Sequence, residues 1–155
     1  MNAQPNTVEG AVARARQRFF VDTFSSKVLS FWPRSFQLNA LPGSEAHTAF
    51  GNEFAAAVEK EIEPLLQDAA PFFGGSDKPT LAEVNIGSFI LRLWALSTTE
   101  GGEYIPAAAI KKLEALPNFG KWAKAVLENP SVLSIWDQDK VIAATLKRFG
   151  RKTEA

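Results

Sequence analysis

Residues 80–96 form the most apolar stretch of the chain, and this stretch opens with a helix-start signal. Thr80 and Glu83 stand three residues apart directly before the apolar run. At this spacing, a threonine and a glutamate side chain form a capping box by accepting hydrogen bonds from each other's backbone N–H groups. Pro79 and Val84 occupy the two positions of a hydrophobic staple across the same start. Apolar residues then lie on every side of the predicted helix, so we expect it to be buried at the centre of a bundle. They are Leu81, Val84, Ile86, Phe89, Ile90, Leu91, Leu93, Trp94 and Leu96.

Four further segments have helical spacing of apolar residues, and no segment shows the alternation of polar and apolar residues that is typical of a strand. Pro33 is expected to end the first of them, and Pro64 to kink or end the second. The second begins at Ser44, whose hydroxyl can cap the helix, and the last has a break near Asp137. Short connections between amphipathic helices predict an all-α fold, a compact helical bundle. The four segments cover residues 9–32, 44–66, 118–130 and 131–149.

Charge and composition exclude several classes of protein. Seventeen basic and seventeen acidic residues cancel, so the chain has no net charge with which to attract nucleic acid or an anionic membrane. It has no cysteine, which excludes disulfides, thiolate metal sites and a cysteine nucleophile in this sequence. No run approaches the length of about 18 apolar residues that a membrane helix needs, and no secretory signal is visible. We therefore expect no nucleic-acid or membrane partner and a cytoplasmic location.

Three stretches carry a family pattern. The first helical segment contains DTFSSKV over residues 22–28, and residues 72–83 read FFGGSDKPTLAE, a glycine loop followed by the capping box. Residues 116–132 read LPNFGKWAKAVLENPSV. With these stretches in place, residues 12–149 resemble the helical C-terminal domain of cytosolic glutathione transferases, most closely the omega-like fungal branch. Most members of the family have aspartate where this chain has Glu83, and glutamate fits the capping-box rule equally well.

The resemblance implies how the chain is divided. Residues 9–149 would be the helical domain of glutathione transferase type, residues 1–8 a remnant of the interdomain linker, and residues 150–155 a flexible tail. Family members also have a thioredoxin-like N-terminal domain that holds glutathione and supplies the catalytic cysteine, serine or tyrosine. Nothing in this sequence resembles that domain. The chain alone is therefore expected to contain no catalytic residue, to bind no cofactor and to be inactive, with glutathione as a co-substrate only when such a domain is supplied.

By the same resemblance, five residues would line the pocket for the hydrophobic electrophile: Arg16, Phe20, Phe24, Arg92 and Trp136. A simpler interpretation stands beside each role. Aromatic residues at helical spacing are more often core than pocket wall, which applies to Phe20 and Phe24. Arg92 lies in the apolar helix, where it could instead pair with a carboxylate or extend its guanidinium to solvent.

Other polar groups have weaker signals. His47 lacks the partner and the orienting group of a catalytic base, and we expect it to be exposed. Residues 59–63 form a charge run typical of a solvated helix face. Asp137 and Asp139 resemble a turn or a cap, and two carboxylates alone make a poor metal site.

Three functions remain open. The chain could be the helical half of a glutathione transferase-like enzyme for glutathione conjugation or thiol transfer. It could be a non-catalytic protein-interaction module. It could also be a binder of lipophilic small molecules, since omega-like fungal members of the family occur in detoxification and secondary metabolism. In each case, apolar surface on the predicted helices over residues 9–32 and 80–96 is expected to be covered by a second copy or by a partner protein.

Overall fold

The structure is a computed structural model that describes residues 6–149. Within these residues it is helical throughout, and the single β-type contact is an isolated bridge between Phe72 and Ser76. The all-α prediction is confirmed. The predicted tail over 150–155 and most of the predicted linker over 1–8 lie outside the described residues. The helices are α1 (Val8–Phe24), α2 (Phe31–Leu38), α3 (Glu45–Glu61), α4 (Leu81–Ser97), α5 (Ala107–Glu114), α6 (Phe119–Glu128), α7 (Pro130–Leu133) and α8 (Gln138–Phe149).

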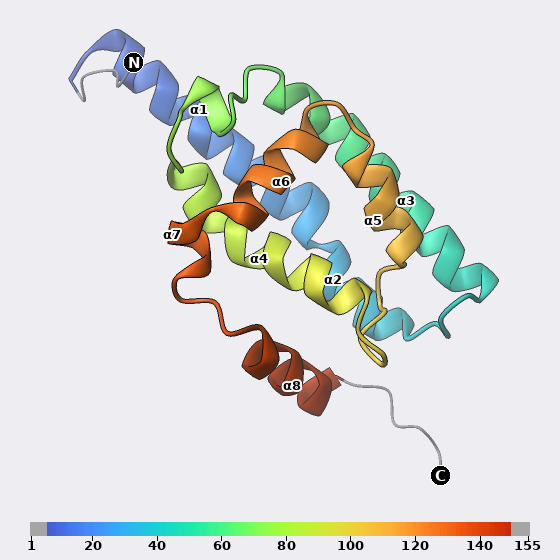
Figure 1. The fold of residues 1–155 in the computed structure, drawn as a ribbon. Coiled ribbons are helices and arrows are strands. Elements are labelled where there is room, and N and C mark those ends of the chain that lie inside the picture. The colour runs from blue at the N-terminus through green and yellow to red at the C-terminus, as the bar shows by residue number, and fades with distance from the viewer. Residues whose placement is uncertain (1–5, 150–155) are drawn as a thin grey trace.

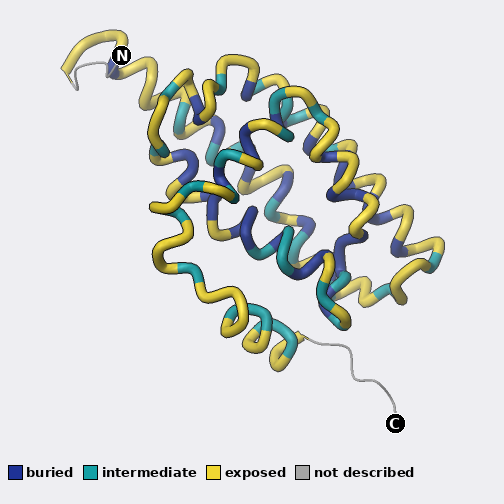
Figure 2. The backbone as a smooth tube through the Cα atoms, viewed as in Figure 1, coloured by how far each residue is buried: buried dark blue, intermediate teal, exposed yellow. Residues whose placement is uncertain are grey.

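Helix α4 runs through the middle of the bundle and touches α1, α5, α6, α7 and α8 (Figure 1). Its capping box forms as predicted. The Thr80 hydroxyl accepts from the N–H of Ala82, and a Glu83 carboxylate oxygen accepts from the backbone N–H of Thr80 at 2.7 Å. Leu93 and Ile90 are fully buried, as are the facing sides of α1, α3 and α6 (Figure 2). The central position of this helix is therefore confirmed.

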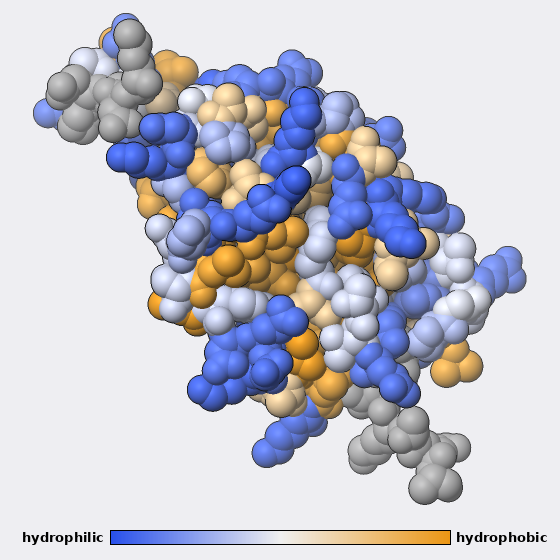
Figure 3. Space-filling model, viewed as in Figure 1, coloured by the Kyte–Doolittle hydropathy of each residue, from blue (hydrophilic) through white to orange (hydrophobic). Residues whose placement is uncertain are grey.

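The prediction that α4 is buried on every side is wrong at its first turns. Leu81 is 62% exposed and Val84 is 70% exposed, so the predicted staple leaves Val84 in solvent. Leu81 borders a hollow whose other lining residues include Arg18 and Val21 of α1. Figure 3 shows a second place, over α4 beside α7, where apolar side chains reach the surface.

The first predicted helix is in fact two helices. Five residues of π-helix, Ser25–Leu29, follow α1, and α2 then continues past Pro33 to Leu38. The expectation that Pro33 ends the helix is wrong because this proline lies in the first turn of α2, where a helix does not need its N–H. The actual end is Asn39, which adopts a left-handed conformation with φ of 44°.

The second predicted helix is confirmed as α3, with Ser44 as its cap. The Ser44 hydroxyl accepts from the N–H of His47 at 3.2 Å, and α3 ends at Glu61, three residues before Pro64. A 3-10 turn over Glu63–Leu66 follows. The exposed location predicted for His47 is wrong, since it is 5% exposed. Its Nδ1 accepts from the N–H of Gly43 at 3.2 Å, and its Nε2 lies 2.5 Å from the Glu103 carbonyl oxygen, so it joins two loops.

Two carboxylates cap helices, and one of them, Glu63, differs from its predicted surroundings. Glu63 was expected on a solvated face, but it is half-buried, and its two oxygens accept from the N–H groups of Asn118 at 2.9 Å and Phe119 at 2.7 Å. It therefore caps α6 from a distant part of the chain. Asp137 caps α8 as predicted, accepting from the N–H of Lys140 at 3.1 Å.

The C-terminal part contributes little to the buried core. Helices α7 and α8 are separated by a turn in which Ile135 is 93% exposed, and α8 has no fully buried residue (Figure 2). Phe149 is 38% exposed and stacks on Phe36 at 4.2 Å between ring centroids. Val132, Trp136, Ile142 and Leu146 are half-buried. Helix α5 was not predicted from the sequence; it is short and buries only Ala109, Ile110 and Leu113.

Candidate functional site

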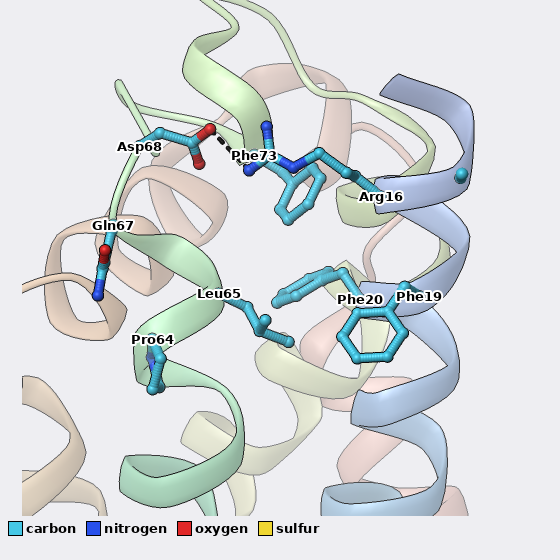
Figure 4. A pocket seen from close by; sticks show the side chains of 9 residues that line it. Arg16, Phe19, Phe20, Pro64, Leu65, Gln67, Asp68 and Phe73 are labelled. Atoms are coloured by element: carbon cyan, nitrogen blue, oxygen red, sulfur yellow. Dashed lines mark hydrogen bonds and ion pairs between the residues drawn. The ribbon is translucent and has the colours of Figure 1, made fainter. Parts of the chain in front are cut away.

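A cavity of about 520 Å³ lies between α1 and the segment that follows α3. Figure 4 shows its labelled side chains: one group comes from α1, a second from the 3-10 turn and the residues after it, and Phe73 from the glycine loop. The volume is within the range typical of small-molecule sites, about 300–1,000 Å³. Its lining residues are Ala15, Arg16, Phe19, Phe20, Pro64, Leu65, Gln67, Asp68 and Phe73.

The loop before α4 holds Phe73 in place. Gly74 and Gly75 have positive φ angles of 68° and 75°, a backbone conformation that residues with a Cβ seldom adopt. They turn the chain back after Phe73, and the Phe73 N–H donates to a Glu83 carboxylate oxygen at 2.8 Å. The capping residue of α4 therefore also fixes one wall of the cavity.

Aromatic rings form the floor. Phe20 is fully buried from solvent and stacks on Phe73, with 4.8 Å between ring centroids. Its other side meets Trp122 of α6 edge-on at 5.7 Å. Leu65 points toward Phe20 across the cavity, and Phe19, 61% exposed, stands at the mouth (Figure 4). Trp122 therefore contacts the floor without lining the cavity, so its fluorescence can respond to a bound ligand.

One ion pair spans the cavity at its polar end. The Arg16 guanidinium donates to the Asp68 carboxylate at 2.8 Å, and its carbon atom lies 5.6 Å from the centroid of the Phe73 ring (Figure 4). Both side chains are about half exposed, at 51% and 44%. An exposed pair of this kind contributes about 0–1 kcal/mol to stability, so a ligand can replace it at little cost. The cavity thus offers an apolar floor with a cation and an anion at one end.

Apolar side chains and one pair of opposite charges line this cavity. Its lining contains no serine, histidine or other group paired with a base as a nucleophile requires. Within residues 6–149, no group of three or more metal-ligating side chains could hold a metal ion. Apolar rings and one pair of opposite charges can hold and orient a small amphipathic molecule.

Of the predicted pocket residues, the structure brings Arg16 and Phe20 together at this cavity. Phe24 lies one turn further along α1, fully buried, with its ring edge-on to Phe89 at 5.8 Å. Arg92 is half-buried on α4, with no ion pair to a carboxylate of the described residues. Trp136 is half-buried in the turn after α7. Neither of these last two lines the cavity, and their roles in binding stay predictions.

Sequence reasoning missed two prominent lining residues, Phe19 and Leu65. Phe19 had a signal, because it is a large apolar residue among Arg14, Arg18 and Asp22 on the wet side of its helix. The spacing of Leu65 from Val58 and Ile62 favours the core side of the predicted helix over residues 44–66. Only the turn at Pro64 redirects it toward α1, and the direction after such a turn does not follow from periodicity.

Within the described residues, no helix is long and apolar enough to cross a membrane.

Comparisons with known proteins leave the family open. No family model, curated protein or solved structure gives a significant match to this chain.

Proposed function

We propose that the chain binds a small, largely apolar molecule in the cavity between α1 and the segment at 64–73. The observation that carries this proposal is the aromatic floor of Phe20 and Phe73 beside a replaceable Arg16–Asp68 pair. Burying apolar ligand surface there would contribute about 25 cal/mol per Å². The guanidinium favours a ligand with one anionic group, because it can form two parallel hydrogen bonds with a carboxylate or sulfonate.

The resemblance to glutathione transferases suggests a role for the bound ligand. In that interpretation the cavity is the electrophile side of a cleft, and a thioredoxin-like domain supplies glutathione as the attacking thiolate. This chain would then hold and orient the electrophile and contribute no catalytic residue. Without such a domain, we expect no turnover of glutathione with a chlorinated nitroaromatic substrate, and clear turnover by the chain alone would contradict this assignment.

Binding is tested with 8-anilinonaphthalene-1-sulfonate, an apolar aromatic probe that carries one sulfonate. We expect saturable dye fluorescence with one site per chain and quenching of tryptophan emission, because Trp122 contacts the floor of the cavity. Uncharged naphthalene should bind at least 5-fold more weakly than the sulfonate, and R16Q should remove this difference.

A pair of matched leucine variants shows where the dye binds. Leu65 lines the cavity, whereas Leu133 of α7 is 38% exposed and lies outside it. We expect L65S to weaken binding about 10-fold, which corresponds to roughly 1.4 kcal/mol, and L133S to leave it unchanged. Equal effects of the two variants, or dye binding that does not saturate, would contradict a site in this cavity.

A further inference from the structure

The charged end of the cavity is an ion pair without net charge. Among the residues that line the cavity, Arg16 and Asp68 carry the charges, and Nη2 of Arg16 lies 2.8 Å from Oδ2 of Asp68. A ligand with a single charge is attracted by one of these groups and repelled by the other. A ligand with two adjacent opposite charges is attracted by both, provided that its charges lie in the reverse order to those of the pair.

The pair keeps hydrogen-bonding capacity for such a ligand. A guanidinium has five N–H donors, and within residues 6–149 Arg16 uses one of them, toward Asp68. In the same part of the chain, Oδ1 of Asp68 accepts no hydrogen bond. Both side chains are about half exposed, so a ligand in the cavity can reach these atoms. The two charges can therefore bind a ligand without separating from each other.

The short distance between the two charges selects the headgroup of the ligand. Because the paired atoms of Arg16 and Asp68 are 2.8 Å apart, the anion and the cation of the ligand must also be adjacent. A free α-amino acid carries both groups on one carbon atom. Its carboxylate can accept two parallel hydrogen bonds from a guanidinium, and its ammonium can donate to a carboxylate. Four charges would then alternate in sign, and each would have an opposite neighbour.

The apolar part of the cavity fits the side chain of a large apolar amino acid. Figure 4 shows the ion pair at one end, Leu65 and Phe20 at the other, and the ring of Phe73 between them. A side chain that extends from the headgroup in this direction would pass Phe73 and end beside Leu65 and Phe20. The cavity volume of about 520 Å³ leaves room for an aromatic ring there. Burial of that ring supplies binding free energy that half-exposed charges alone supply poorly.

We infer that the ligand of this cavity is a free α-amino acid with an aromatic or other large apolar side chain. This inference rests on the proposed binding function and adds an ammonium group to the anionic group of the ligand. The carboxylate binds Arg16, the ammonium binds Asp68, and the side chain lies on the floor formed by Phe20 and Phe73. A peptide fits less well, because each of its termini carries only one of the two charges.

Three ligands that share a naphthalene ring and differ in their charged groups test the headgroup. Naphthylalanine carries both charges, naphthylpropanoate only the carboxylate, and naphthylethylamine only the ammonium. Isothermal titration calorimetry at neutral pH measures each dissociation constant directly, so the result does not depend on binding of a fluorescent dye. We expect naphthylalanine to bind about 5-fold more tightly than either analogue, which is the effect expected of one half-exposed ion pair.

Substitutions in the pair assign each charge of the ligand to its partner. D68N removes the partner of the ammonium, so naphthylalanine and naphthylpropanoate should then bind equally. R16Q removes the partner of the carboxylate, so naphthylalanine and naphthylethylamine should then bind equally. D77N and R18Q change the net charge in the same way at exposed residues that do not line the cavity, and the preference should persist in both. Unchanged far-ultraviolet circular dichroism shows that each variant folds.

The L65S variant separates failure of this inference from failure of the binding proposal. Equal binding of the three ligands, each weakened about 10-fold by L65S, would keep the cavity as a binding site and overturn the amino-acid headgroup. A preference for naphthylalanine that persists in D68N or in R16Q would also overturn it. Absence of binding by all three ligands, or binding that L65S leaves unchanged, would overturn both proposals.

Discussion

Removing the Glu83 carboxylate is the sharpest test of how this bundle is held together. Glu83 is fully buried, and four donors converge on it. The N–H of Phe73 at 2.8 Å and the indole N–H of Trp122 at 2.7 Å donate to one oxygen. The N–H and the hydroxyl of Thr80, both at 2.7 Å, donate to the other. Every partner donates, which suits an ionised carboxylate because this group only accepts.

Replacing Glu83 with glutamine or with alanine should lower the free energy of unfolding by different amounts. Glu83→Gln keeps one accepting oxygen, which can serve Phe73 and Trp122, while its amide group faces Thr80. The Thr80 hydroxyl can rotate to accept, but the Thr80 N–H cannot. One backbone bond is then lost and two others lose their charge assistance, for a cost of about 2–3 kcal/mol. Glu83→Ala leaves buried donors unsatisfied at about 1–3 kcal/mol each, so we expect a loss of at least about 4 kcal/mol.

Urea unfolding followed by circular dichroism measures these costs, and the chain contains a matched control. Glu114 also accepts from an indole N–H, that of Trp94 at 3.0 Å, but on the exposed surface. Water replaces that bond when it is lost, so Glu114→Ala should cost less than about 1 kcal/mol. A domain of this kind has about 5–15 kcal/mol of stability in total, so Glu83→Ala brings it close to unfolding. Glu83→Gln with an unchanged midpoint, or equal costs for Glu83→Ala and Glu114→Ala, would refute the reasoning.

Two further predictions concern polar contacts at the ends of helices. A backbone N–H can only donate, so His47 Nδ1 accepts from Gly43, and Nε2–H donates to the Glu103 carbonyl oxygen. His47→Ala loses both bonds and should lower the unfolding free energy by about 2 kcal/mol, with a loss below about 0.5 kcal/mol counting against the clamp. At α8, the Lys140 side chain and then its N–H lower the pKa of Asp137 from the ordinary 3.8, while slight desolvation opposes them. The stability that the Asp137 cap gives to α8 is present above pH 3.8 and is lost as pH falls through the lowered pKa. Protection of the α8 amides from hydrogen exchange should therefore drop in that pH range. Asp137→Asn should remove this pH dependence.

Local signals in the sequence were sufficient for much of the fold, because their physics acts over one or two turns. Thr80 and Glu83 are three residues apart, and Ser44 caps a backbone N–H three residues away, so their geometry follows from spacing alone. Pro33 shows the limit of such rules. A proline ends a helix or occupies its first turn, and the choice depends on whether the preceding π-helical residues pack well enough to restart a helix.

The remaining features depend on contacts between distant residues. Spacing revealed the Thr80 half of the Glu83 site, but not the Trp122 indole 39 residues away. Glu63 lies in a charge run and still caps α6 across 55 residues, because the turn at Pro64 directs it inward. The cavity likewise joins α1 to residues 64–73. Arg16 and Phe20 were predicted at a pocket through family resemblance, and helical periodicity alone indicated only core packing for Phe20.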